Sequence, residues 1–347
     1  MNIQRKSLWA VGIMALALLT APAAVAQLQG MPEASPDASV SQVIGVSKIT
    51  IDYHRPAVRG RTIMGALVPN DQVWRAGANE NTTITFSDPV KVEGESLAAG
   101  TYGLHMIPGE KDWTVIFSTN STSWGSFSYD QEEDALRVTA QAEKASFEER
   151  VTFGFDSLDN DSGRVYVHWE ETKVPFEVEF DTTALALAEI RNQLRSRAGF
   201  DWRGFVAAAN FCLQNDTNLE EALQWADQAI ARQENFNTLF VKGRLLQRMG
   251  DGEAEAMMAK ALPLGNEQQV NFAGYQYLQA GQVERAIEIF QKNVDDHPES
   301  WNVYDSLGEA YGAKGDTQSS RRLYQKALEM APENQKPRIE GILNSMS

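Results

Sequence analysis

Hydrophobic residues recur with a period of two from about residue 41 to residue 181. Strict alternation of this kind predicts strands with one buried face. Turn residues such as Gly94 bound each short run, and no helical stretch separates the runs, so neighbouring strands should pair antiparallel. Eight or nine such strands predict a β-sandwich or a flattened barrel over residues 41–181. Two clear runs are Ile49, Ile51, Tyr53 and Val174, Phe176, Val178, Phe180.

After Asp181 the hydrophobic period changes to 3.6, which indicates helices. We expect a connecting helix over residues 182–199, helical repeats over 200–334 and a capping helix over 335–347. The clearest repeats are 267–300 and 301–334, with the same kinds of residue 34 positions apart. The matched positions are Ala273, Gly274, Tyr277, Gly281, Phe290, Pro298 and Leu307, Gly308, Tyr311, Gly315, Tyr324, Pro332.

Small residues and aromatics at this period resemble the tetratricopeptide repeat. Two degenerate copies upstream would bring the total to four hairpins, enough for a stable stack. The fold class is therefore α+β, with an antiparallel β-domain followed by a helical solenoid. The resemblance implies a protein or peptide partner, or a scaffold or dimerisation surface. Groove positions in phase with the repeat are Arg244, Asn271, Tyr275, Asn302, Asp305 and Glu309. They are neutral to acidic, which argues against capture of a carboxylate terminus.

The amino terminus has the three-part pattern of a secretory signal peptide over residues 1–26. Arg5 and Lys6 precede an apolar stretch that is too short to span a bilayer, and small residues end at Ala26. Residues 27–40 lack periodicity and predict a disordered leader. We therefore expect an exported protein, periplasmic or secreted, with no integral membrane segment after cleavage.

The chain is acidic, with a formal net charge of −16. Removal of residues 1–26 would leave 29 basic and 47 acidic residues, a net charge of −18. Such a chain repels phosphate backbones, which disfavours nucleic-acid binding. Cys212 is the single cysteine, so no intrachain disulfide, tetrathiolate metal site or paired-cysteine redox centre can form.

One stretch departs from both the strand pattern and the overall charge. Residues 54–81, here called the arginine-rich segment, carry four arginines against only Asp71 and Glu80. Loops this long inside compact domains are usually functional or disordered, and the apolar residues here favour order. The arginines are Arg55, Arg59, Arg61 and Arg75.

Within this segment the run Val73-Trp74-Arg75-Ala76-Gly77-Ala78-Asn79-Glu80 resembles domain-of-unknown-function family 2911, a group of exported bacterial proteins. Further matching positions continue to Trp169, so that the resemblance covers about residues 39–180. His54 and Met64 depart from the usual residues of that family. The resemblance implies an exported β-domain that is often joined to helical repeats, and it implies no reaction.

The segment suits an anionic or carbohydrate-like ligand, because arginine pairs with carboxylate, sulfate or phosphate and tryptophan stacks on sugar rings. The alternative is an internal network in which Arg75 pairs with Glu80, Asn79 forms a turn and Trp74 plugs the core. Both interpretations stay open at this stage. The candidate ligand-binding residues are Arg55, Arg61, Trp74, Arg75, Asn79 and Glu80.

No complete catalytic or metal-binding set is evident. The four histidines, His54, His105, His168 and His297, have no spacing typical of a zinc site, and no nucleophile elbow or phosphate loop occurs. We therefore expect no metal, no cofactor and no catalytic residues. An exported binding or assembly module is favoured over a hydrolase-like enzyme with Glu80 or His54 as base, and over a purely structural, homo-oligomeric envelope protein.

Overall fold

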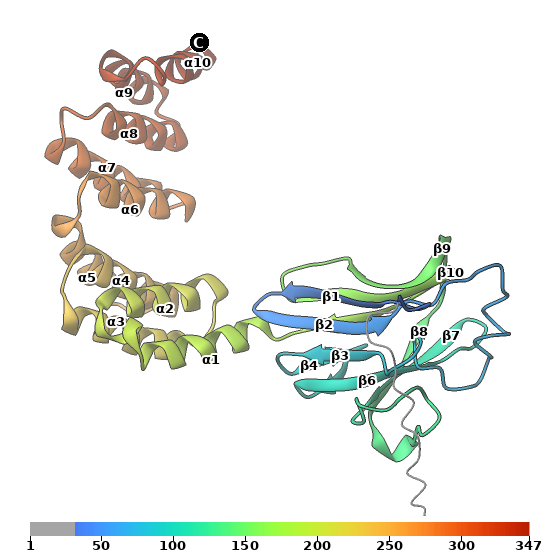
Figure 1. Ribbon diagram of the computed structural model, residues 1–347. Helices are drawn as coiled ribbons and strands as arrows, with labels where there is room; N and C mark the ends of the chain where they lie inside the picture. The colour runs from blue at the N-terminus through green and yellow to red at the C-terminus, as the bar shows by residue number, and fades with distance from the viewer. Residues whose placement is uncertain (1–31, 347) are drawn as a thin grey trace, which may run out of the picture. The chain divides into compact units, whose positions relative to one another are not determined.

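The structure is a computed structural model that describes residues 32–346. The chain divides after Phe180 into two units, a β-domain and a helical unit (Figure 1). The signal peptide predicted for residues 1–26 lies outside the described residues. Each unit is described separately below.

Two antiparallel sheets form the β-domain (Figure 1). The larger sheet has the order β1-β2-β3-β6-β7-β8 and the smaller one has the order β5-β4-β10-β9. The strands of the larger sheet are β1 Asp37–Ile44, β2 Ser47–His54, β3 Thr83–Phe86, β6 Gly100–Ile107, β7 Asp112–Ser118 and β8 Asp134–Gln141. Those of the smaller sheet are β4 Val90–Val92, β5 Glu95–Leu97, β9 Glu143–Asp156 and β10 Ser162–Glu179.

The two sheets face each other across an aromatic core. Phe117 of β7 meets Phe176 of β10 with ring centroids 5.9 Å apart, and Tyr53 of β2 meets Phe153 of β9 at 4.9 Å. These contacts join strands of different sheets, so the inward residues of the period-two pattern form one hydrophobic layer. The strands of residues 32–346 thus form a sandwich of two open sheets, as the sequence predicts, and not the barrel that it left open.

The arginine-rich segment connects β2 to β3 and is attached to both sheets. Trp74 exchanges two backbone hydrogen bonds with Met106 of β6, at 2.7 and 2.8 Å. At the other end of the segment, the amide of Val58 donates to the carbonyl of Glu149 in β9. Ile63 is fully buried between these attachments. The segment is therefore an ordered part of the domain, because strand-like bonds satisfy its backbone at both ends.

The leader predicted for residues 27–40 is too long. Strand β1 begins at Asp37, and residues 37–40 pair in register with β2. Seven of its eight residues are exposed or only partly buried, which explains why hydrophobic periodicity missed it: an edge strand needs backbone partners more than buried side chains.

The described part of the helical unit contains ten α-helices. The first, α1 Thr182–Leu194, is the connecting helix, and nine others follow it. Eight of them form four hairpins, which Figure 1 shows as a succession of antiparallel pairs. The hairpins are α2 Trp202–Asn215 with α3 Leu219–Arg232, α4 Phe236–Met249 with α5 Ala254–Ala261, α6 Glu267–Gln279 with α7 Val283–Asp296, and α8 Trp301–Lys314 with α9 Thr317–Met330. The last helix is α10 Lys336–Ser345.

Local signals start and stop these helices. Asn235 and Asn266 each form a reciprocal capping box, which satisfies otherwise unpaired amides at the starts of α4 and α6. Gly315 ends α8 in the left-handed conformation. The connecting helix is shorter than the predicted 182–199, because it ends at Leu194 and a 3₁₀ turn occupies Arg197–Phe200.

The repeat glycines fit where the two helices of a hairpin approach each other. A Cβ added at Gly274 would lie 2.5 Å from the ring of the fully buried Phe290, which leaves no room for a side chain. At Gly308, 34 residues later, the nearest atom would be 3.3 Å away, on Tyr324. A side chain at this repeat position is therefore excluded at Gly274, whereas at Gly308 it fits only if its neighbours shift by a few tenths of an ångström.

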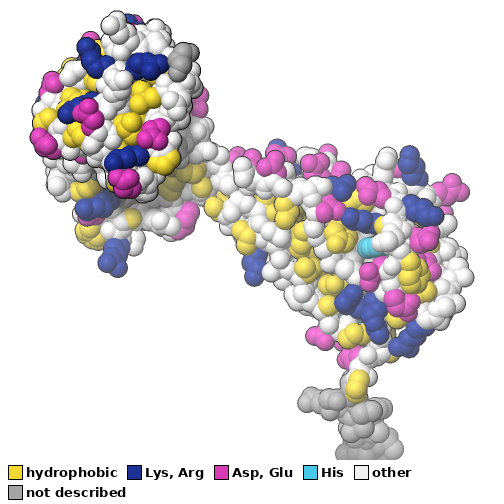
Figure 2. All heavy atoms as spheres, turned by 90° about the horizontal axis from the view of Figure 1, so that it is seen from above, with side chains coloured by type: hydrophobic (Ala, Val, Ile, Leu, Met, Phe, Trp, Pro, Cys, Tyr) yellow, Lys and Arg dark blue, Asp and Glu magenta, His cyan; other side chains and the backbone are white. Residues whose placement is uncertain are grey.

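No helix within residues 32–346 is long and apolar enough to cross a membrane. On the face drawn in Figure 2, basic, acidic and hydrophobic side chains are interspersed over each unit. The negative charge of the chain is thus not gathered into a single acidic patch on that face.

Candidate functional site

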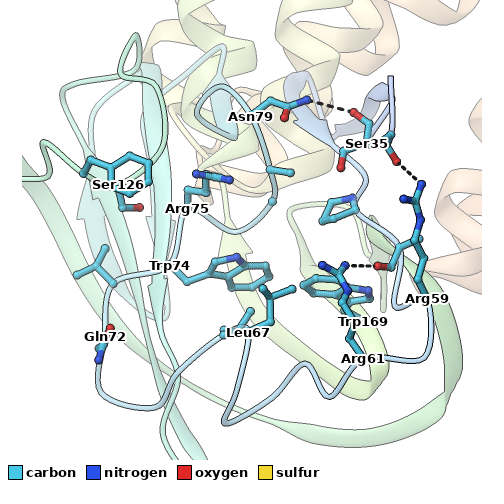
Figure 3. A pocket seen from close by; sticks show the side chains of 18 residues that line it. Ser35, Arg59, Arg61, Leu67, Gln72, Trp74, Arg75, Asn79, Ser126 and Trp169 are labelled. Carbon is cyan, nitrogen blue, oxygen red and sulfur yellow. Dashed lines mark hydrogen bonds between the residues drawn. The ribbon is translucent and has the colours of Figure 1, made fainter. Parts of the chain in front are cut away.

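A cavity of about 790 Å³ in the β-domain opens beside the arginine-rich segment (Figure 3). No Asp or Glu of the described residues lines it, although acidic residues outnumber basic ones in the chain. Most of its wall comes from residues 56–79, and the rest comes from residues 34–35, from the loop after β7 and from β10. The charged and aromatic lining residues are Arg59, Arg61, Trp74, Arg75, Phe127 and Trp169.

Arg75 is the most unusual of these residues. Its side chain is half-buried, and its Nε is enclosed without any hydrogen-bond partner among the described residues. Burial lowers the pKa of the guanidinium, and no neighbouring carboxylate opposes this effect. The guanidinium lies over the ring of Trp124, whose centroid is 5.6 Å from Cζ. A guanidinium in this state is available to an external anion.

The other two cavity arginines are held by backbone carbonyls. Arg61 donates from Nη2 to Ala57 at 2.6 Å and from Nε to Val58 at 3.1 Å. Arg59 donates to the carbonyl of Ala34 at 3.4 Å. These bonds orient both side chains and leave their positive charges uncompensated within the cavity.

Aromatic rings line the cavity and lie next to it. Trp74 stacks on Trp169 of β10 with centroids 6.0 Å apart and planes 17° apart. Trp124 stacks on Phe127 at 5.9 Å, and both rings are largely exposed. Flat apolar faces next to cations suit a ligand that has both a ring and a negative charge.

Of the six candidate ligand-binding residues, four line this cavity: Arg61, Trp74, Arg75 and Asn79. The other two lie elsewhere. Arg55 points to β9, where it donates to the carbonyl of Val151 at 2.8 Å and to the hydroxyl of Thr152 at 2.7 Å. Arg55 is therefore a structural tie between the segment and the smaller sheet.

Glu80 lies outside the cavity and is mostly exposed. Its carboxylate is 3.3 Å from Nε2 of His54, not beside Arg75. The internal Arg75–Glu80 network is thus wrong. The geometry also does not support an enzyme that uses Glu80 or His54 as base, since neither residue lines the cavity with the arginines.

Residues just before β1 form one edge of the cavity. The Asn79 amide donates to the carbonyl of Ser35 at 3.4 Å (Figure 3), and it also donates to the carboxylate of Glu33 at 3.1 Å. The amide of Arg55 donates to the carbonyl of Pro36 at 2.9 Å. Residues 33–36 of the predicted leader are thus held to the arginine-rich segment by hydrogen bonds.

A second polar cluster was missed by the sequence analysis. Nδ1 of His105, on β6, is 2.9 Å from the hydroxyl of Ser126, which lines the cavity. Tyr129 packs against the His105 ring and donates from its hydroxyl to Asp134 at 2.7 Å, and Arg137 contacts both of these partners. The spacing of these residues matches no motif, so only the fold brings them together.

Within the described residues no group of three or more His, Cys, Asp or Glu side chains is arranged to hold a metal ion. His54 and His105 lie in separate environments, the first beside two glutamates and the second beside Ser126.

In the helical unit, Arg244 stands apart from the other predicted groove residues. It borders a cavity of about 580 Å³ that α2, α4 and α6 line. Burial lowers the pKa of its guanidinium, with no acidic neighbour to oppose the effect. Phe272, which is half exposed, lies on the same cavity. Side-chain amides also line it, from Asn210, Gln214, Asn237, Asn266, Gln268 and Gln269.

Three of the other groove positions make contacts within the helical unit. Tyr275 bonds to Glu309 at 2.8 Å, Asp305 pairs with Arg338 at 2.7 Å, and Asn302 reaches Glu267 at 3.4 Å. Asn271 has an enclosed Oδ1 without a partner among residues 32–346. Three of the predicted groove positions are thus engaged in internal contacts, whereas Arg244 borders the cavity described above.

Comparison with known proteins agrees with this division. Residues 35–178, which belong to the β-domain, match the model of the DUF2911 family, described as a protein of unknown function. Residues 277–333 match a tetratricopeptide repeat model, in the order expected from the sequence. Tetratricopeptide repeats mediate protein–protein interaction, and the helical unit is of this type. No curated protein matches the chain.

Solved structures with similar folds cover less than half of this chain. One is MamA from Desulfovibrio magneticus RS-1, at 21% identity over 42% of this chain and 82% of that one, with a TM-score of 0.30. Another is YrrB, titled a tetratricopeptide protein with an unusual peptide-binding site, at 17% identity over 44% and 79%, with a TM-score of 0.29. The Cut9–Hcn1 complex matches at 20% identity over 46% and 32%, with a TM-score of 0.32.

Proposed function

We propose that this protein is an exported binding module in which the cavity of the β-domain holds a small anionic ligand that also carries a ring. The observation that carries this proposal is the state of Arg75. A half-buried guanidinium without an internal acid costs stability, and a cavity without acidic residues leaves it free for a ligand. Uronic acids, sugar phosphates and aromatic carboxylates all have this chemistry.

Isothermal titration of the mature protein with glucuronate, glucose 6-phosphate and benzoate tests the proposal. We expect one of these probes to bind and Arg75→Gln to weaken its binding at least about tenfold, the loss that one charge-assisted hydrogen bond produces. Lys144→Gln removes the same charge from an exposed position outside the cavity and should leave binding unchanged. Equal binding by wild type and Arg75→Gln would remove the basis of the proposal.

For the helical unit we propose an extended acidic peptide as partner, held in the cavity around Arg244. Side-chain amides hydrogen-bond to peptide backbone, and an uncompensated guanidinium suits a carboxylate. Fluorescence anisotropy with labelled Glu-rich and Gln-rich peptides of equal length separates charge from backbone recognition. Arg244→Gln should abolish the preference for the Glu-rich peptide, and Arg203→Gln, at an exposed site with its own acidic partner, should not. Equal affinity for both peptides would contradict the role of Arg244.

Export rests on the signal-peptide pattern of residues 1–26. The amino-terminal residue of the protein purified from the cell envelope should be Gln27, as read by mass spectrometry. An intact Met1 in the purified protein would contradict cleavage at this position.

A further inference from the structure

Ser126 and His105 form a hydroxyl–imidazole pair at the wall of the β-domain cavity. The hydroxyl is 2.9 Å from Nδ1, within the range of a hydrogen bond. Ser126 is partly exposed and lines the cavity, whereas His105 is buried beneath it on β6. The hydroxyl can therefore meet a bound molecule while the imidazole is shielded from solvent.

The surroundings of His105 keep it neutral and oriented. Burial lowers its pKa to about 4, and the carboxylate of Asp134 opposes this shift by favouring the charged form. Tyr129 links the two, because its ring packs on the imidazole at 5.4 Å and its hydroxyl bonds to Asp134. Arg137 contacts both Tyr129 and Asp134 and offsets part of this negative charge. A neutral imidazole with the proton on Nε2 offers Nδ1 as an acceptor to the serine hydroxyl.

The backbone next to Ser126 places it beside Arg75. Gly125 has φ +73°, and a Cβ at this position would lie 2.7 Å from Nη1 of Arg75. Figure 3 shows Ser126 and Arg75 on the same side of the cavity. The unpaired guanidinium thus borders the turn that presents the hydroxyl, where it can hold the negative charge of a ligand or of a developing oxyanion.

From this geometry we propose that Ser126 is a nucleophile and His105 its general base, in the hydrolysis of a carboxylic ester whose anionic group is held by Arg75. The choice of an anionic ester rests on the function proposed above for the cavity. The Ser126–His105 pair is a separate observation and does not depend on that choice.

The reaction balances without a cofactor. Oγ of Ser126 bonds to the ester carbonyl carbon while its proton passes to Nδ1 of His105. Collapse of the tetrahedral intermediate breaks the bond to the alcohol, which leaves with that proton. Water then gives a proton to Nδ1 and attacks the acyl-serine, and the acid departs as Ser126 regains its hydrogen.

The competing interpretation is that the Ser126–His105 bond only anchors residues 119–133 to β6. An anchoring hydroxyl has ordinary reactivity, whereas a nucleophile activated by a base is modified faster by electrophiles. A nearby serine provides an internal standard, because Ser128 is exposed and forms no bond to His105.

The test is covalent labelling of the mature full-length protein with a neutral fluorophosphonate probe, read by peptide mass spectrometry. We expect label on Ser126 at least about tenfold faster than on Ser128, because a base with a lowered pKa contributes less than the full factor of general-base catalysis. Ser126→Ala should abolish the label, and His105→Gln should reduce it to the rate of Ser128. Circular dichroism of each variant confirms that it is folded. Equal labelling of Ser126 and Ser128 in the wild type would overturn the proposal.

A second assay separates this proposal from the function proposed for the cavity. The mono-p-nitrophenyl ester of succinate is anionic and p-nitrophenyl acetate is neutral, and both release a coloured alcohol. We expect Arg75→Gln to slow hydrolysis of the anionic ester at least about tenfold more than hydrolysis of the neutral ester, because only the anionic ester loses a charge contact with its substrate group. Labelling of Ser126 without any preference for the anionic ester would uphold the nucleophile and reject the anionic ligand. Anion binding without labelling of Ser126 would uphold the anionic ligand and reject the nucleophile.

Discussion

The sharpest test of the cavity compares the same substitution at two arginines of one segment. Arg75 has an enclosed Nε without a partner, whereas Arg55 donates hydrogen bonds to Val151 and Thr152 in β9. Methionine keeps the length and apolar stem of either side chain while removing its charge and donors. The free energy of unfolding should therefore change in opposite directions at the two positions.

The magnitudes follow from these contacts. An unsatisfied buried donor costs about 1–3 kcal/mol, and the contact of Arg75 with the exposed Trp124 ring returns about 0.5–1 kcal/mol. Arg75→Met should thus stabilise the ligand-free protein by about 1 kcal/mol, or roughly 2–4 °C in melting temperature. Arg55→Met loses two hydrogen bonds from a charged group and should destabilise it by about 2–4 kcal/mol.

Urea unfolding of the full-length protein gives both values. Hydrogen exchange of peptides from residues 37–180 assigns the transition to the β-domain. Arg75→Met should also lose the ligand that binds the wild type, so that stability and binding change in opposite senses. If Arg75→Met destabilises the protein as much as Arg55→Met, Arg75 is a structural tie and the reasoning about a free guanidinium is wrong.

Three further predictions concern His105 and the glycines. Burial lowers the pKa of His105 from 6.5 to about 4, so the unfolded chain binds a proton below pH 6.5 while the folded protein does not. The free energy of unfolding is therefore unaffected above pH 6.5 and should fall by up to about 3 kcal/mol towards pH 4. Urea unfolding of His105→Gln across this range should show a correspondingly flatter pH profile, and an unchanged profile would exclude this residue as the cause. Gly125→Ala forces a side chain into a left-handed conformation against Arg75, so it should cost about 1–3 kcal/mol in thermal unfolding and weaken ligand binding; normal binding would contradict the packing. Gly274→Ala should cost about 1–3 kcal/mol by overpacking, whereas Gly308→Ala should change stability by less than about 1 kcal/mol; equal losses on chemical unfolding would refute the steric difference.

Much of the architecture follows from local pattern. Alternation such as Ile49, Ile51 and Tyr53 determines a strand and its buried face, because side chains along a strand point to opposite sides. The 34-residue spacing of Gly274 and Gly308 determines the repeat, because each hairpin buries its face against the next. The arginine-rich segment was also evident from sequence, since a cluster of arginines and a tryptophan departs from both the strand period and the acidic composition.

Only the tertiary structure decides which residue each of these side chains contacts. Arg55 and Arg75 belong to one segment and are the same residue type, yet Arg55 meets a strand almost a hundred positions later in the chain, and Arg75 meets no acid among the described residues. The sequence left open an internal network in which Arg75 pairs with Glu80, whereas the structure places the Glu80 carboxylate beside His54. The pairing of His105 with Ser126 arises in the same way, because packing of a loop on β6 sets their distance and no residue spacing encodes it.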